Sequence, residues 1–218
     1  VTNEAGTNYS KEQEISIISP KELITIHNIP ELGIETIGEE NEIFYTVEKG
    51  AEEKTINIES QVINNNEGDI KDISILGNFG TNQEKNNMGI NLVSGINVEA
   101  IDNSKISIYY TENAEANEDL QDENNGWNEQ ILDNSKVCKY LIKVTSMTKS
   151  ESIKLKYQIN IPANLEYNKN AYQGYKVTYT NETTGEAGSV NSTIINLETG
   201  KGPEIEAILT AKVGNKIL

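Results

Sequence analysis

One segment of the chain alternates apolar and polar residues over nine positions. Between Ile153 and Ile161 every odd position is Ile, Leu or Tyr and every even position is Lys, Gln or Asn, and Pro162 ends the pattern. Successive side chains of a β-strand point to opposite faces of its sheet, so this pattern predicts a strand with one face in a core and the other in water.

Similar runs recur along the chain, with turn residues such as Asn and Gly between them. The runs expected to form strands are 15–18, 23–29, 43–47, 54–64, 70–76, 90–100, 105–110, 137–147, 152–161, 171–180, 189–197 and 204–213. Ten or more strands with short turns predict an all-β fold. We expect an antiparallel β-sandwich of the immunoglobulin-like or Greek-key type, with a short N-terminal extension.

The two ends of the chain suggest how it is divided. Pro20 and Pro30 restrict the first two runs to sheet edges or connections, so residues 1–38 are expected to be a linker with short edge strands. Residues 39–218 are expected to form one large β-sandwich domain, with two smaller sandwiches as the alternative. Residues 19–26 and 202–209 share a small residue, a proline and an alternating strand pattern. This similarity indicates the end of a preceding repeat and the start of a following one, with chance as the alternative.

The charge of the chain limits its partners. The formal net charge is -16, and the 18 basic residues are all Lys. Such an acidic chain repels nucleic acid and anionic lipid, which excludes both as expected partners. No apolar run is long enough to span a membrane, so we expect no membrane insertion. The sequence starts at Val1 without a leader and is interpreted as a fragment of a longer protein that is monomeric in solution.

Residues that could carry chemistry are few. His27 is the single histidine and Cys138 the single cysteine, so they cannot supply a usual zinc site, and we expect a half-exposed structural histidine and a buried inert thiol. The acidic residues between 115 and 133 could bind calcium through Asp119, Asp122 and Asn124, although EF-hand spacing is absent. Solvated carboxylates are the simpler interpretation. No pair of carboxylates is marked as that of a glycosidase.

Trp127 is the residue best suited to bind a ligand. An indole ring can stack on a sugar or anchor a partner, whereas the simpler interpretation is a plug over one end of the sandwich. Exposed Tyr side chains around Trp127 would favour sugar binding, and a buried Trp127 would favour the plug.

One tryptophan and several segments form a further pattern, namely Trp127, 136–147, 159–162 with 164–165, 175–179, and 192–194 leading to 199–203. Together they resemble a known family, the conserved-repeat β-sandwich of exported Gram-positive, clostridial-type surface proteins that form adhesin-like stalks. The resemblance implies an extracellular location, at the bacterial cell surface or in the cell wall, and a host or cell-wall protein or glycan as partner. It supplies no catalytic residues.

These observations lead to two hypotheses. The first is a non-enzymatic structural or adhesive module of a bacterial cell-surface protein, which spaces or presents binding regions and needs no cofactor. The alternative is a carbohydrate-binding module that uses Trp127 and nearby Tyr with the assistance of calcium.

Overall fold

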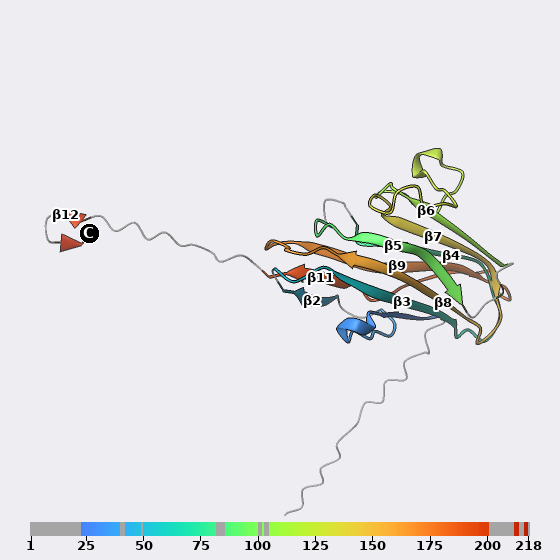
Figure 1. Ribbon diagram of the computed structural model, residues 1–218. Coiled ribbons are helices and arrows are strands. Elements are labelled where there is room, and N and C mark those ends of the chain that lie inside the picture. The colour runs from blue at the N-terminus through green and yellow to red at the C-terminus, as the bar shows by residue number, and fades with distance from the viewer. Residues whose placement is uncertain are drawn as a thin grey trace, which may run out of the picture.

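Two β-sheets stacked face to face form the protein (Figure 1). The computed structural model describes residues 23–39, 42–48, 50–81, 86–99, 102 and 105–200, and the backbone of 212–213 and 216–217. In this part of the chain there is no α-helix, and its short 3-10 turns include η1 (Pro30–Leu32) and η3 (Glu123–Asn125). The predicted all-β sandwich is therefore confirmed.

The smaller sheet has four antiparallel strands. Their order across the sheet is β1 (Leu23–Asn28), β3 (Lys54–Asn64), β8 (Ser152–Ile161) and β5 (Asn91–Glu99). The run at 23–29 was expected to lie at an edge, and β1 is an edge strand of this sheet. It pairs with β3, so it belongs to the same sandwich as the strands beyond residue 39.

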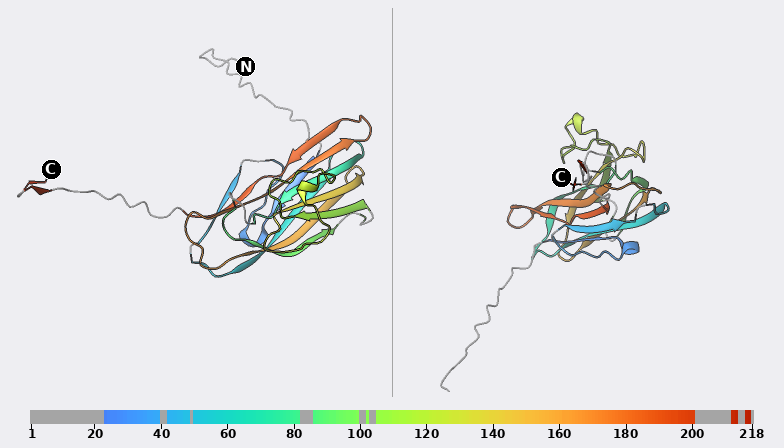
Figure 2. Two further views of the ribbon diagram at one scale, coloured as in Figure 1. Left: turned by 90° about the horizontal axis from the view of Figure 1, so that it is seen from above. Right: turned by 90° about the vertical axis from the view of Figure 1, so that its left-hand side faces the viewer.

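The larger sheet has seven strands. Their order is β2 (Ile43–Val47), β11 (Ile195–Thr199), β9 (Asn170–Asn181), β4 (Ile70–Asn78), β7 (Lys139–Met147) and β6 (Ile106–Thr111), and β10 (Ala187–Asn191) also pairs with β9. One pair, β2 with β11, is parallel, and this departs from a purely antiparallel sandwich. The short strands β12 (Lys212–Val213) and β13 (Lys216–Ile217) pair with each other. Figure 2 shows the sandwich from above and from one side.

Strand β8 has the two faces that its sequence predicts. Its five Ile, Leu and Tyr side chains are at most 3% exposed and lie in the core, whereas Lys154 is exposed on the other face. Because β8 lies between β3 and β5, its backbone is hydrogen-bonded on both sides. Burial of these side chains is a large favourable contribution to folding, at roughly 25 cal/mol for each Å² of apolar surface removed from water.

The run at 189–197 was expected to be one strand, and the structure divides it into β10 and β11. Both pair with the same edge of β9, and residues 192–194 interrupt the ladder between them. At Ser192 one backbone bond of the ladder remains, since its N–H donates to the Tyr175 carbonyl at 2.8 Å, while its Oγ accepts from the Tyr175 N–H at 2.9 Å. Thr193 is drawn away, because its N–H and its hydroxyl both donate to the Gly38 carbonyl. The interruption is therefore a bulge held by side chains.

Tyrosine and phenylalanine rings fill the centre between the sheets. Phe79 packs against Tyr140 and Tyr157, with ring centroids 5.1 and 5.0 Å away. Tyr110 of β6 crosses to the other sheet, where its hydroxyl accepts from the Ile96 N–H of β5 at 3.0 Å. Burial raises the pKa values of Tyr140 and Tyr157, so both phenols stay neutral.

Two predicted strands lie outside the described residues. These are the run at 15–18 and most of the run at 204–213, of which only β12 is described. Within the described part, no helix has the length and apolar character needed to cross a membrane.

Candidate functional site

His27 is completely buried, so the expectation of a half-exposed side chain was wrong. It lies on the inward face of β1, where Tyr175 of the other sheet stacks on the imidazole. Neither ring nitrogen has a hydrogen-bond partner among the described residues. Burial lowers the pKa of His27 to about 4, so the ring is neutral at pH 7. A neutral imidazole without a polar partner is suited to packing, not to proton transfer.

Cys138 is buried, as expected. Its side chain is 1% exposed, and Sγ lies 3.4 Å from the Thr111 carbonyl oxygen. Cys138 precedes β7, whereas His27 lies on β1, the far edge strand of the other sheet. The structure therefore does not bring the histidine and the cysteine together in a nucleophile–base arrangement.

The acidic segment between β6 and β7 is an ordered loop built around Asn125. This side chain is 3% exposed, and its amide donates to Asn117 Oδ1 at 2.9 Å and to the Asp119 carbonyl at 2.7 Å. Its Oδ1 accepts from the Asn117 N–H. Thr111 fastens the loop to the end of β6 by donating to the Asn125 carbonyl at 2.6 Å. A single buried amide thus satisfies several backbone groups of the loop.

Trp127 belongs to the same loop and is half-buried. Its indole N–H donates to the Asn117 carbonyl at 2.9 Å. The next residue, Asn128, pairs with Tyr110 through two backbone hydrogen bonds. The indole N–H therefore ties the ring to the backbone of its own loop.

Asp119, Asp122 and Asn124, the candidate calcium ligands, lie in consecutive turns of this loop. Asp119 Oδ1 accepts from the Gln121 N–H, and Asp122 Oδ1 accepts from the N–H and the amide of Asn124. Asx turns of this kind explain the position of these two Oδ1 atoms. Among the described residues, no group of three or more His, Cys, Asp or Glu side chains is arranged to hold a metal ion.

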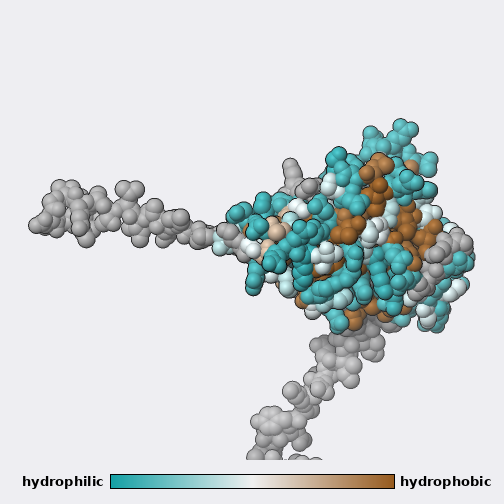
Figure 3. All heavy atoms as spheres, in the orientation of Figure 1, coloured by the Kyte–Doolittle hydropathy of each residue, from teal (hydrophilic) through white to brown (hydrophobic). Residues whose placement is uncertain are grey.

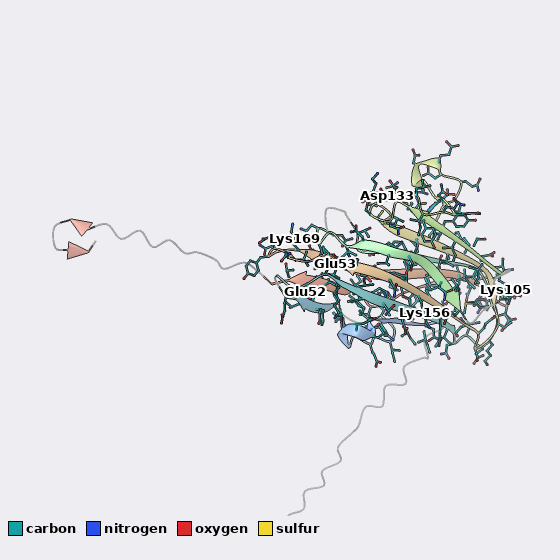
Figure 4. The ribbon with its side chains drawn as sticks, viewed as in Figure 1. Glu52, Glu53, Lys105, Asp133, Lys156 and Lys169 are labelled. Carbon is teal, nitrogen blue, oxygen red and sulfur yellow. The ribbon has the colours of Figure 1, made fainter. Side chains whose placement is uncertain are left out.

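Charged side chains are spread over the sandwich (Figure 4). Glu52, Glu53 and Lys169 lie near one end, Lys105 lies at the other, and Asp133 lies on the segment after β6. The ion pairs of the described residues join partly exposed side chains, as in the pair of Lys156 with Glu99 at 3.0 Å. Pairs of this kind contribute little to stability.

A groove on the outer face of the larger sheet was not predicted from the sequence. Its volume is about 840 Å³, and its lining comes from β4, β7 and β9 and from residues near 40 and 192. Here we name it the Tyr172 groove; the lining residues that matter most are Glu42, Asn78, Lys139, Tyr172, Gly174 and Lys176. Because these residues come from distant parts of the sequence, no local motif reveals the groove.

A second surface feature is an apolar patch at the edge of the sandwich that β5 and β6 form. On the face drawn in Figure 3, apolar side chains gather between β5 and β6, which are the edge strands of the two sheets. Val93 is 42% exposed and Leu132 is 74% exposed, and a smaller pocket of about 390 Å³ lies beside Leu132.

Comparison with known proteins gives only remote similarities. No family model and no curated protein matches the chain. The chain is similar in structure to the D312A variant of BcpA, the major pilin subunit of Bacillus cereus, at 10% identity and a TM-score of 0.49, over 91% of this chain and 47% of the pilin. It is also similar to the major pilin SpaD of Corynebacterium diphtheriae, at 6% identity and a TM-score of 0.40, over 80% of this chain and 34% of SpaD.

A third similar structure is the collagen-binding subdomain of the Enterococcus faecalis surface protein ACE. It matches at 11% identity and a TM-score of 0.33, over 70% of this chain and 92% of the subdomain. The chain spans about half or less of the length of the two pilins. At these identities and TM-scores, the matches assign the chain to no family.

Proposed function

We propose that the chain is a non-enzymatic structural or adhesive module of a bacterial cell-surface protein, which spaces or presents binding regions. The observation that carries this proposal is that the chain enters the sandwich at one end of the strands and leaves it at the other end. β1 starts at Leu23, which pairs with Asn64 at the last residue of β3. At the other end, the Gly200 carbonyl accepts from the Asn168 N–H in the connection between β8 and β9. The eleven residues of β3 span roughly 33 Å between these ends.

A force applied through these two ends would act along the strands. β1 is antiparallel to β3 and β11 is antiparallel to β9, and the hydrogen bonds of such ladders run perpendicular to the strands. Pulling the ends apart therefore loads the bonds of each ladder together, whereas peeling a strand would break them one at a time. This arrangement suits a link in an extended stalk.

Interactions between the sheets also suit such a link. The Tyr175 hydroxyl of β9 lies 2.7 Å from the Ile26 carbonyl oxygen and 2.9 Å from that of Gln61, and these are paired residues of β1 and β3. Thr25 donates to the Asn191 carbonyl at 3.0 Å and so ties β1 to the end of β10. Strand β1 is thus held by contacts across the sandwich as well as by its neighbour β3.

The sequence adds two kinds of support. Its resemblance to exported Gram-positive repeat domains favours an extracellular location, at the cell surface or in the cell wall. The pattern of residues 19–26, which runs into β1, recurs at 202–209, so in this proposal a further repeat follows the sandwich. The partly buried Trp127, whose indole N–H is hydrogen-bonded, supports a plug more than a sugar platform.

Labelling of the bacterium that makes the protein tests this proposal. Antibodies raised against the folded chain should label intact cells as strongly as permeabilised cells. A cytosolic protein of the same bacterium, labelled only after permeabilisation, serves as the control. If the chain is also labelled only after permeabilisation, the proposal is wrong.

A further inference from the structure

We propose that the Tyr172 groove binds a short neutral oligosaccharide. The inference rests on the proposed function, because it names the ligand class of an adhesive module. It places the binding site on the outer face of the larger sheet, and not at Trp127.

Gly174, which has no side chain, is one of the buried residues that line the groove. Gly174 of β9 pairs with Asn78 of β4, and Asn78 in turn pairs with Lys139 of β7. A Cβ added at Gly174 would point toward Ile194 and Ser192, which also line the groove, at an ordinary contact distance of 3.5 Å. The groove volume of about 840 Å³ lies within the range of sites that take small ligands.

The charges around the groove are balanced. Glu39 and Glu42 contribute two carboxylates, and Lys139 and Lys176 contribute two ammonium groups. Within the groove the two ammonium groups offset the two carboxylates, so the lining itself favours neither an anionic nor a cationic ligand. The net charge of -16 further disfavours anionic ligands. A ligand whose groups both donate and accept hydrogen bonds fits this lining, and sugar hydroxyls do both.

Specific polar atoms are available for such hydroxyls. Glu42 lines the groove and is exposed, so its carboxylate oxygens can accept from a ligand hydroxyl. Lys139 Nζ donates to the Ala116 carbonyl at 2.9 Å, which leaves further donors on the same ammonium group.

Aromatic and aliphatic surface lies beside these polar atoms. Tyr172 is partly exposed in the groove, and Ile194 on its rim is 47% exposed. Phe44 of β2 pairs with Asn196 of β11, which pairs with Tyr172, and the Phe44 side chain is 58% exposed. The apolar face of a pyranose ring can pack on such surface while its hydroxyls reach Glu42 and the two lysines.

An array of immobilised short neutral oligosaccharides, with sialylated and sulfated sugars and with acidic and basic peptides, tests the inference. The wild-type chain should bind at least one neutral oligosaccharide. Tyr172→Ala removes the ring, and Gly174→Leu adds a side chain at a residue that lines the groove. Both should weaken binding by at least about tenfold, which corresponds to about 1.4 kcal/mol. Trp127→Ala is the matched aromatic control and should leave binding within about twofold.

Thermal unfolding of each variant keeps the test interpretable. The backbone φ of Gly174 lies outside the left-handed region and an added Cβ finds ordinary contacts, so the backbone accepts a side chain at this position. The binding result for Gly174→Leu counts only if this variant unfolds near the wild-type temperature, and Tyr172→Ala decides the test if it does not. Binding lost in Trp127→Ala but kept in the two groove variants would overturn the inference. Binding to anionic sugars or peptides only, or to no probe, would also overturn it. In either case the cell-labelling result, and with it the proposed function, would stand unchanged.

Discussion

His27 and Tyr175 stack with 5.6 Å between ring centroids and 20° between ring planes, although one belongs to the edge strand of the smaller sheet and the other to the centre of the larger sheet. The contact packs β1 of the smaller sheet against β9 of the larger sheet. It buries an ionisable ring and places a phenol hydroxyl on the backbone of β1 and β3. Both consequences can be measured.

The buried imidazole makes stability depend on pH. In the unfolded chain His27 has an ordinary pKa near 6.5, whereas in the folded protein its pKa is about 4. Unfolding therefore takes up a proton between these values, so the stability that depends on a neutral ring is present above about pH 6.5 and is lost as the pH falls toward 4. The difference of about 2.5 in pKa corresponds to about 3 kcal/mol.

His27→Phe removes this titration and keeps a ring against Tyr175. Between pH 7 and pH 4 the free energy of unfolding of the variant should fall by about 3 kcal/mol less than that of the wild type. Urea unfolding at a series of pH values checks the difference, and the carboxylates common to both proteins cancel in the comparison. Equal losses for the two proteins would show that folding does not lower the pKa of His27 and would contradict this prediction.

Tyr175→Phe tests the hydroxyl that joins the sheets. Removal of its hydrogen bond to the backbone should lower the free energy of unfolding by about 1 kcal/mol. Tyr109→Phe, at a partly exposed position on β6, is the matched control and should change stability by less than about 0.5 kcal/mol. Equal effects of the two substitutions would contradict a specific role for the Tyr175 hydroxyl.

Two glycines of the larger sheet should respond oppositely to alanine. A Cβ at Gly77 would overlap the buried ring of Tyr140, its partner on β7, so Gly77→Ala should destabilise the protein by about 1–3 kcal/mol. A Cβ at Gly174 meets only ordinary contacts, so Gly174→Ala should be neutral or stabilise by up to about 1 kcal/mol. Chemical unfolding of both variants measures this difference. A loss of stability in Gly174→Ala as large as that in Gly77→Ala would contradict it.

Asn125→Ala should loosen the loop that carries Trp127. The substitution leaves the Asn117 N–H and the Asp119 carbonyl without their partner, so amide hydrogen exchange should accelerate in residues 113–126. Asn124→Ala is the control, because the Asn124 side chain is exposed and bonds only to Asp122 among the described contacts. Unchanged exchange in Asn125→Ala would mean that other contacts hold the loop.

The strands themselves were predictable from the sequence, because burial of one face imposes a period of two. The predicted bounds of the strands at 43–47, 54–64 and 152–161 agree with β2, β3 and β8. The division of 189–197 was not predictable, because it depends on Ser192 and Thr193 bonding to residues far away in the sequence. The parallel pairing of β2 with β11 is likewise a matter of topology, about which a local pattern carries no information.

The candidate site was less predictable than the strands. The burial of His27 depends on Tyr175, which lies 148 positions further along the chain. The groove combines residues near 40, 78, 139, 174 and 192, each unremarkable in its own segment. Trp127 stands out in the sequence because it is the single tryptophan and lies in a polar segment. The Tyr172 groove instead includes Gly174, a residue type that gives no hint of a binding site in the sequence.

Single-molecule force measurement tests most directly whether the sandwich is built as a load-bearing link. Handles attached at Leu23 and Gly200 pull along the strands, and handles at Leu23 and Ser150 pull from one end, because Leu23 and Ser150 both lie beside Asn64. Forced unfolding reports the barrier to unfolding along the chosen direction. The proposed function predicts a clearly higher unfolding force for the first pair. An equal or lower force through Leu23 and Gly200 would contradict it.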